Sequence, residues 1–384
     1  MSTDQSKQIQ GPVRFIPGDQ KTARPPIGSA LCLSGGGYRA MLFHLGTLWR
    51  LNQAALLESL DRVSSVSGGS ISAAVLGLNW SRLRFAGGVA DNLTELVIGP
   101  CRKLASHTID VPSVLLGLLL PGGVPGRIAS CYRKYLFGNE TLASLPPAPF
   151  FVINSTNVQS KVLWRFTKRY MADYRVGLVP DPPTKLATAV GASSAFPPFL
   201  SPVVLKLKES QYQPKSGLDL QFPPYTTRVV LTDGGVYDNL GIETAWKNCD
   251  TIFVSDGGGA TADQPKPARN WLGHIYRVLN VINNQVGSLR KRQVIDSFVN
   301  QERKGAYWGI RTNIADYRLP STLPCPYEKT LKLAKVATRL KALDSKTQEM
   351  LINWGYAVCD AALRAHVNNT IPQGTFPYPS VGVG

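Results

Sequence analysis

Five serines and two adjacent glycines stand together in the stretch DRVSSVSGGSISAAVLG, residues 61–77. The apolar residues before Ser67 predict a short buried strand, and those from Ile71 to Leu78 recur at the spacing of a core-facing helix. Ser67 therefore falls at a corner between a strand and a helix. The first amides of that helix carry partial positive charge, which suits an oxyanion. The stretch predicts a nucleophilic serine at position 67, with a helix N-cap as the alternative role for the same residue.

The corner also matches the nucleophile-elbow pattern G-x-S-x-G, except that Ser65 replaces the first glycine. Gly68 and Gly69 follow the serine, and a tight turn favours glycine because a side chain would clash there. The other serines of the stretch fall on the predicted strand or inside the predicted helix, where the corner does not present them: Ser64, Ser65, Ser70 and Ser72.

A second glycine-rich corner lies upstream, in SGGGYRA at residues 34–40. Gly35, Gly36 and Gly37 follow a predicted buried strand and precede a predicted helix, so their amides are free to face a ligand oxygen. The loop lacks the G-x-x-x-x-G-K-[ST] pattern of a Walker loop, and Ala40 replaces the last glycine of a dinucleotide fingerprint. Beside an elbow serine, the loop predicts an oxyanion hole, because acyl transfer needs a nucleophile and hydrogen-bond donors together.

Two further predicted strands, TRVVLTDGG and TIFVSDGGG, each end in Asp-Gly-Gly, which makes Asp233 and Asp256 candidate bases. An aspartate near its reference pKa of about 3.9 is a poor base at neutral pH, so this role requires burial that raises the pKa. A histidine base is the alternative, since His274 and His366 follow these aspartates in the order Ser, Asp, His. The apolar pattern around His274 is more typical of a core histidine.

Taken together, these segments resemble bacterial patatin-like phospholipases. SGGGYRA is similar to the family's glycine-rich oxyanion loop, SVSGG to its elbow, and DGGVYDNLG (233–241) to its Asp-Gly-Gly motif. AVGASSAFPPFL (189–200) resembles the family's Ala/Ser-rich segment. The resemblance extends over about residues 29–260.

The resemblance implies a Ser–Asp dyad without histidine, in which Ser67 is the nucleophile and Asp233, whose GVYDNLG continuation matches the family, is the base. It places the oxyanion hole on the loop that carries the three glycines and Arg39. The implied reaction is phospholipase A-type cleavage of membrane glycerophospholipids through an acyl-enzyme, without metal or organic cofactor. Some relatives are antiphage effectors activated by cyclic nucleotides, which would make a small nucleotide an activator. The resemblance also assigns roles to six glycines. Gly35, Gly36 and Gly37 form the oxyanion loop, and Gly69, Gly234 and Gly235 support the elbow and Asp-Gly-Gly motifs.

Composition limits the setting of this chemistry. The 384 residues carry a net charge of +17 and no apolar run of about 20 residues, which a bilayer-spanning helix requires. The N-terminus lacks an apolar signal core, and the six cysteines form no C-x-x-C pair, so we expect buried thiols in a reducing cytosol and no zinc site. The basic charge favours an anionic partner. We expect an anionic membrane surface at the inner face of the membrane, because no motif supports nucleic acid.

The order of predicted strands and helices in the first 80 residues indicates a three-layer α/β/α fold with a mostly parallel central sheet. We expect one hydrolase domain over residues 29–367, helical additions from about 268, and polar tails at 1–28 and 368–384. The leucine-rich segment within 108–126 predicts a lid, a membrane-touching loop or a core helix. Two rival functions stay open from the residues alone: an α/β-hydrolase esterase with a histidine base, and a non-enzymatic protein that binds anionic nucleotides at the glycine loop.

Overall fold

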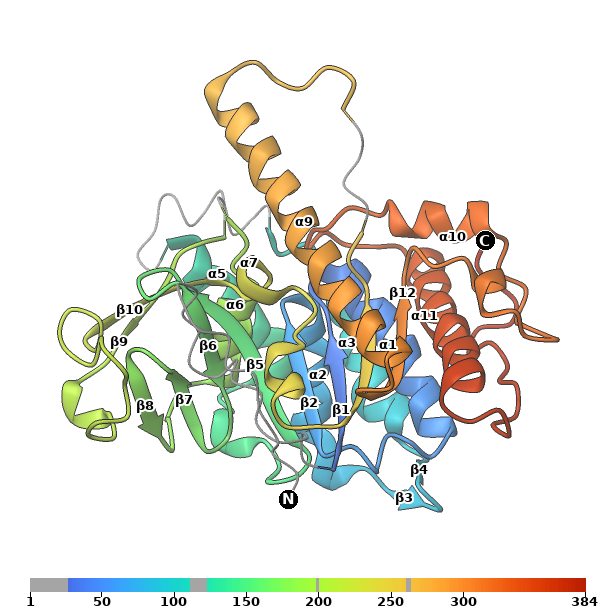
Figure 1. Cartoon of the computed structure of the whole chain (residues 1–384), viewed down its shortest axis with the longest axis horizontal. Coiled ribbons are helices and arrows are strands. Elements are labelled where there is room, and N and C mark those ends of the chain that lie inside the picture. The colour runs from blue at the N-terminus through green and yellow to red at the C-terminus, as the bar shows by residue number, and fades with distance from the viewer. Residues whose placement is uncertain (1–26, 111–122, 198–199, 260–263) are drawn as a thin grey trace, which may run out of the picture.

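One mixed sheet of ten strands organises the part of the chain that the computed structural model describes, residues 27–110, 123–197, 200–259 and 264–384 (Figure 1). The main path through the sheet has the order β12-β11-β1-β2-β5-β6-β7-β8, and β10 joins it by pairing with both β5 and β9. The strands are β1 Ser29–Leu33, β2 Arg62–Val66, β5 Phe150–Asn157, β6 Val162–Phe166, β7 Tyr170–Asp173, β8 Gly177–Pro180, β9 Val203–Lys206, β10 Arg228–Asp233, β11 Thr251–Asp256 and β12 Lys304–Gly309. A separate small hairpin pairs β3 Phe85–Ala86 with β4 Val89–Ala90.

The five strands β12, β11, β1, β2 and β5 run parallel to one another, whereas β6 to β10 pair antiparallel. Parallel strands are covered on both faces, so both sets of alternating side chains are apolar. In β1, Leu31 and Leu33 pack into the larger core, and Ala30 and Cys32 into the smaller core on the opposite face. The same alternation explains why SALCL reads as a continuous apolar run.

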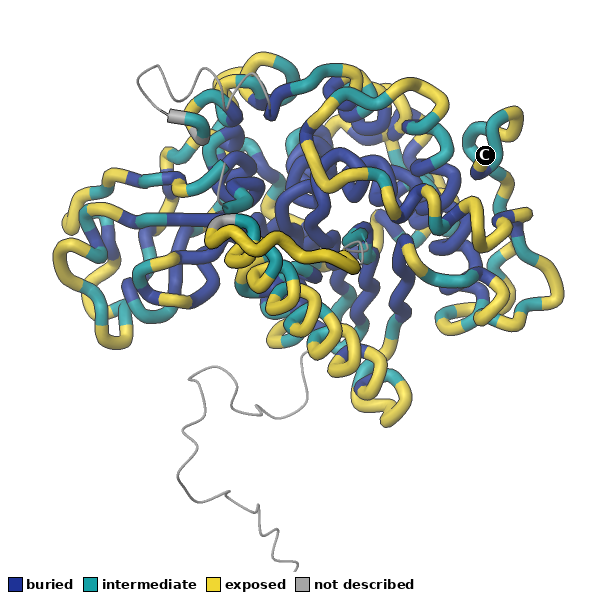
Figure 2. Tube along the Cα trace, turned by 90° about the horizontal axis from the view of Figure 1, so that it is seen from above, coloured by how far each residue is buried: buried dark blue, intermediate teal, exposed yellow. Residues whose placement is uncertain are grey.

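Helices cover the two faces of the sheet and form the outer layers (Figure 2). The first face carries α1 Gly37–Gln53, α2 Gly68–Asn79, α6 Leu186–Ser193 and α11 Ser345–His366, together with α3 Gly99–Ala105 and α5 Gly123–Tyr132 beside them. The second face carries α7 Gly235–Asp238, α8 Glu243–Trp246 and α9 Trp271–Val299. The short helix α10 Tyr327–Ala334 precedes α11. The predicted three-layer fold, the parallel strands and the additional C-terminal helices are therefore confirmed.

The C-terminal helix α11 crosses α1 with their backbones in contact. A Cβ atom on Gly355 would lie 1.9 Å from the carbonyl oxygen of Phe43, so only glycine permits this approach. Residues 368–384 then return along α11, where the Asn353 side-chain amide donates hydrogen bonds to the carbonyls of Tyr378 at 2.8 Å and Gly382 at 2.7 Å. The C-terminal part of the chain thus packs directly on the helix that begins at the glycine loop.

Two sequence expectations concern segments at the border of the described residues. The predicted lid around 108–126 lies largely outside them, because residues 111–122 are not described and α5 begins at Gly123. Within the described residues, the helices are all too short or too polar to cross a bilayer. Five of the six cysteines are buried thiols, as expected, namely Cys32, Cys101, Cys249, Cys325 and Cys359, whereas the thiol of Cys131 is only half-buried.

Candidate active site

The register of β5 brings Ser67 and Asp233 together. On one edge of β5, Val66 at the end of β2 pairs with Asn154. Asp233 at the end of β10 pairs with Ser155, the next residue along the same edge. Since β2 and β10 approach from opposite directions, their carboxyl ends meet there, and the residue after Val66 lies beside Asp233. Two segments separated by more than 160 residues therefore supply one site.

Ser67 occupies a strained corner between β2 and α2. Its backbone has φ 50° and ψ −118°, in a region that costs a non-glycine residue about 1–3 kcal/mol unless its surroundings enforce it. Ser67 immediately precedes α2, but its hydroxyl makes no capping hydrogen bond to that helix within the described residues. Ser67 as a whole is only 8% exposed. This geometry is the one expected of an elbow serine rather than of an N-cap.

The Ser67 side chain instead lies beside the carboxyl group of Asp233, close enough to lower its pKa. Asp233 is buried and accepts a hydrogen bond of 2.7 Å from the Gly235 N–H. Burial raises the pKa of Asp233 to about 7, and the Gly235 hydrogen bond and the neighbouring Ser67 hydroxyl oppose this rise only in part. At neutral pH the carboxyl group is therefore close to half ionised, as a general base requires.

Ser193, at the end of α6, holds the backbone of Ser67 and that of Gly234, the residue after Asp233. Its hydroxyl oxygen accepts from the Ser67 N–H at 2.9 Å and donates to the Asn154 carbonyl at 2.6 Å. Its carbonyl accepts from the Gly234 N–H at 3.3 Å. The sequence predicted no role for Ser193, although the Ala/Ser-rich segment that contains it was part of the family resemblance. A serine at the last turn of a helix carries no local sign of such a contact.

The glycine loop lies against the elbow, because a Cβ atom on Gly68 would lie 2.2 Å from the Gly37 carbonyl oxygen. Gly36 has φ 145° and Gly37 has φ 62°, conformations that favour glycine. The Gly35 N–H donates to the Asn239 carbonyl at 3.0 Å, so this amide is already engaged. Among the described residues, the amides of Gly36 and Gly37 have no backbone acceptor, which leaves them as the donors available to an oxyanion.

Arg39 lies behind the loop and does not bond to Ser67. Its buried guanidinium donates to the carbonyls of Gly257 and Val336, and its Nη2 atom has no hydrogen-bond partner among the described residues. A Cβ atom on Gly36 would lie 3.0 Å from that Nη2 atom, so the charge borders the loop. Burial lowers the pKa of Arg39 to about 10, partly opposed by the nearby Asp256 carboxylate, so the group remains a cation at neutral pH.

Asp256, the second Asp-Gly-Gly aspartate, is engaged elsewhere. It accepts hydrogen bonds from the Tyr307 hydroxyl at 2.6 Å and from the Gly258 N–H at 2.8 Å. These contacts tie the end of β11 to β12 and to the following turn. Asp256, which the sequence offered as a second candidate base, therefore has a structural role at the end of β11.

The histidines that could have served as the base also lie in other contacts. His366 packs against the Tyr317 ring at the end of α11. His274 is exposed near the start of α9, so the expectation of a core histidine was wrong. His44 is buried between Ser255 and the Ser34 carbonyl, and burial lowers its pKa to about 4. Among the described residues, no group of three His, Cys, Asp or Glu side chains is arranged to hold a metal ion.

The candidate site lies within the part of the chain that a known protein-family model matches. A family model described as "Patatin-like phospholipase" matches residues 31–246. The structure is similar to human GIVD cytosolic phospholipase A2 in complex with methyl gamma-linolenyl fluorophosphonate, at 14% identity and a TM-score of 0.50. That alignment covers 87% of this chain and 57% of the human one. VipD from Legionella pneumophila aligns at 16% identity and a TM-score of 0.36, over 89% of this chain and 67% of its own.

The chain spans about half the length of the human phospholipase structures that it matches, since a second human structure aligns over 46% of its length. No curated protein matches the sequence. At 14% identity the similarity to the human structure shows a shared fold only. The segment matched by the family model contains the elbow, the glycine loop and the Asp-Gly-Gly motif of β10.

Proposed function

Because the chain belongs to the patatin-like phospholipase family, we propose that it hydrolyses the acyl esters of membrane glycerophospholipids with a Ser67–Asp233 dyad. One observation carries the proposal: the strained elbow serine lies beside a buried aspartate whose pKa is about 7. A serine hydroxyl is a weak nucleophile until a base accepts its proton. Asp233 is placed for that role and is ionised in a large fraction of molecules at neutral pH.

The reaction proceeds in two halves. Asp233 accepts the Ser67 proton while the Ser67 oxygen attacks the ester carbonyl carbon. The amides of Gly36 and Gly37 stabilise the resulting oxyanion, with help from the positive end of α2. Asp233 then returns the proton to the departing lysophospholipid oxygen. In the second half, Asp233 accepts a proton from a water molecule whose oxygen attacks the acyl carbon. The bond to the Ser67 oxygen then breaks, Asp233 returns the proton to that oxygen, and a fatty acid is released.

The setting of the reaction is part of the same proposal. The net charge of +17 favours peripheral binding at the anionic inner face of the membrane, and the buried thiols suit a reducing compartment. Activation by a small nucleotide, and the antiphage role that it would serve, stay predictions of the family resemblance.

A fluorophosphonate probe tests the proposal, because it labels a serine only where the hydroxyl is activated. We expect labelling at Ser67, release of fatty acid from phosphatidylglycerol vesicles, and loss of both after Ser67→Ala. Asp233→Ala should abolish the release of fatty acid. Ser72→Ala is the matched control, since Ser72 lies on α2 and its hydroxyl donates to the Met41 carbonyl.

Two results would contradict the proposal. Equal loss of activity after His366→Ala in a folded protein would favour the esterase with a histidine base. Absence of labelling in a folded wild-type protein that binds nucleotide would favour the non-enzymatic alternative.

A further inference from the structure

Helix α9 is much longer than the strand beside it. It connects the carboxyl end of β11 to the amino end of β12, and these two strands are parallel neighbours. Its 29 residues span about 43 Å at 1.5 Å per residue, whereas the six residues of β12 span about 20 Å. The first half of α9 must therefore extend beyond the carboxyl edge of the sheet. Figure 1 shows this end projecting from the body of the protein.

The projecting half of α9 carries an exposed apolar stripe. Trp271, Ile275, Val278, Leu279 and Ile282 follow one another at offsets of 4, 7, 8 and 11 residues, which places them on one face of a helix. All five are exposed, with 74% for Trp271 and 52% for Ile282. Contiguous exposed apolar side chains of this kind mark an interaction surface.

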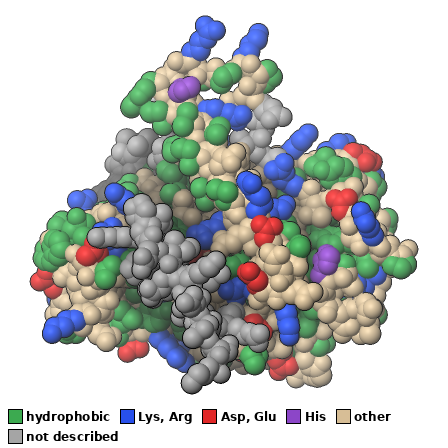
Figure 3. All heavy atoms as spheres, in the orientation of Figure 1, with side chains coloured by type: hydrophobic (Ala, Val, Ile, Leu, Met, Phe, Trp, Pro, Cys, Tyr) green, Lys and Arg blue, Asp and Glu red, His purple; other side chains and the backbone are tan. Residues whose placement is uncertain are grey.

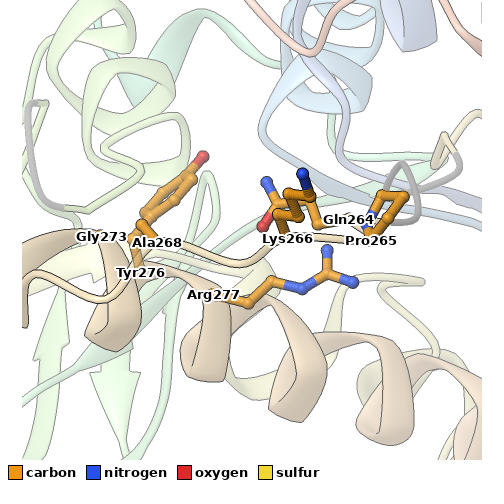
Figure 4. Close-up of a pocket in the computed structure, with 7 residues that line it drawn as sticks. All are labelled: Gln264, Pro265, Lys266, Ala268, Gly273, Tyr276 and Arg277. Carbon is orange, nitrogen blue, oxygen red and sulfur yellow. The ribbon is translucent and has the colours of Figure 1, made fainter.

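The described residues of the projecting segment carry charge of a single sign. Residues 264–295 contain no aspartate or glutamate, and Lys266, Arg269 and Arg277 surround the projecting end. Figure 3 shows hydrophobic and basic side chains together on this projection. The loop before α9 and the start of the helix border an open hollow of about 700 Å³ whose lining includes Lys266, Tyr276 and Arg277 (Figure 4). The surface thus combines apolar contact with attraction for anions.

We propose that the projecting half of α9, residues 264–282, docks the enzyme on an anionic lipid bilayer, with the apolar stripe among the acyl chains and the basic groups at the phosphates. An interfacial helix has this composition: aromatic and aliphatic residues on one face with Lys and Arg beside them. A second copy of the chain fits less well, because two such helices would bring like charges together. The inference rests on the proposed function, which supplies the reason for docking.

The position of the surface relative to the dyad supports this assignment. Ser67 follows β2 at the carboxyl edge of the parallel strands, and the projection leaves the body at that same edge. Near its base, α9 packs against α7, the helix that begins two residues after Asp233. Docking through α9 would therefore bring the edge of the sheet that carries Ser67 toward the bilayer.

Sedimentation with vesicles tests the proposal. The probes are vesicles of phosphatidylcholine alone and of phosphatidylcholine with phosphatidylglycerol, at low and high salt. We expect Ile275→Asp combined with Ile282→Asp to lower the partition coefficient on anionic vesicles at least about tenfold, equivalent to about 1.4 kcal/mol. Lys266→Gln combined with Arg269→Gln should weaken binding at low salt and have little effect at high salt.

Val299→Asp is the matched control, because Val299 is 73% exposed on the same helix but lies at the opposite end. All these variants should retain hydrolysis of a soluble short-chain ester, which needs no docking. The single change Ile282→Asp serves if the double variant fails to fold. Unchanged vesicle binding in a folded Ile282→Asp protein would overturn the proposal. If that variant instead dissociates a dimer or releases a protein partner, the surface binds protein and not lipid.

The result is separable from the proposed chemistry. Ser67→Ala should bind vesicles like the wild type while releasing no fatty acid. A wild-type protein that binds vesicles through α9 but hydrolyses no ester would leave the docking surface in place and refute the dyad.

Discussion

Replacing Asp233 by asparagine is expected to stabilise the folded protein at neutral pH while abolishing hydrolysis. Burial raises the pKa of Asp233 from the ordinary value of 3.8 to about 7. Between these two values the unfolded chain carries an ionised carboxylate, whereas the folded protein holds the proton. The unfolded state then binds fewer protons, so the free energy of unfolding falls as pH rises through this window.

The size of the effect follows from the two pKa values. Each pKa unit corresponds to about 1.4 kcal/mol, so ionising Asp233 in the folded state costs about 4 kcal/mol by pH 8. Asparagine has no charge to bury and can still accept the Gly235 hydrogen bond. The difference in unfolding free energy between Asp233→Asn and the wild type should therefore grow by about 4 kcal/mol between about pH 4 and pH 8.

Urea unfolding of both proteins across this pH range measures the difference directly, because contributions from other titrating groups cancel. Ser67→Ala is the control for loss of activity alone. It removes a hydroxyl group that lowers the pKa of Asp233, so it should retain the pH dependence of the wild type or steepen it. Parallel curves for the wild type and Asp233→Asn would show that the carboxyl group titrates normally and would refute the reasoning.

Three other predictions follow from the site. The kcat/KM of the wild type on a soluble ester should rise with pH through about 7, because only ionised Asp233 accepts the Ser67 proton; a flat profile from about pH 5 to pH 9 would contradict this. Gly37→Ala should lower kcat about 100-fold and the unfolding free energy by about 1–3 kcal/mol, since Gly37 has φ 62° and an added Cβ would lie 2.6 Å from the Arg339 carbonyl oxygen. Wild-type values of kcat and of urea-unfolding free energy in this variant would contradict the prediction. Asp256→Asn should cost about 1.5–3 kcal/mol of stability by weakening the bond from Tyr307 while keeping kcat within about threefold, and a selective loss of turnover would instead assign Asp256 to the chemistry.

Local pattern was sufficient to predict the elements that end at the site. The strand before Ser67, the helix after it, and the strands that end at Asp233 and Asp256 lie where the apolar spacing and glycines placed them. Pattern alone did not distinguish the two aspartates, because both follow an apolar strand and precede glycines. The distinction depends on β10 reversing beside β5 so that Asp233 pairs with Ser155, and such a register is a non-local property.

Other features had no local signal for a related reason. Ser193 contacts the Ser67 amide only because α6 ends above β5, which no spacing in the sequence reports. The opposite error occurred at His274, where an apolar helical pattern suggested a core residue. Periodicity identifies which side chains share a face of α9, but it does not state whether protein or solvent lies against that face.

The glycine loop at residues 34–40 is held partly by residues that follow it by about 300 positions in the sequence. The Tyr38 N–H donates to the Arg339 carbonyl, and the Arg39 guanidinium is fixed by Gly257 and Val336. Ser67 and Asp233 have both been translated a hundred residues before Arg339 leaves the ribosome. A nascent chain would therefore hold the proposed nucleophile and base before it holds all the anchors of its glycine loop. If the proposed function is correct, translation order alone would delay ester hydrolysis until the segment around Arg339 has been made.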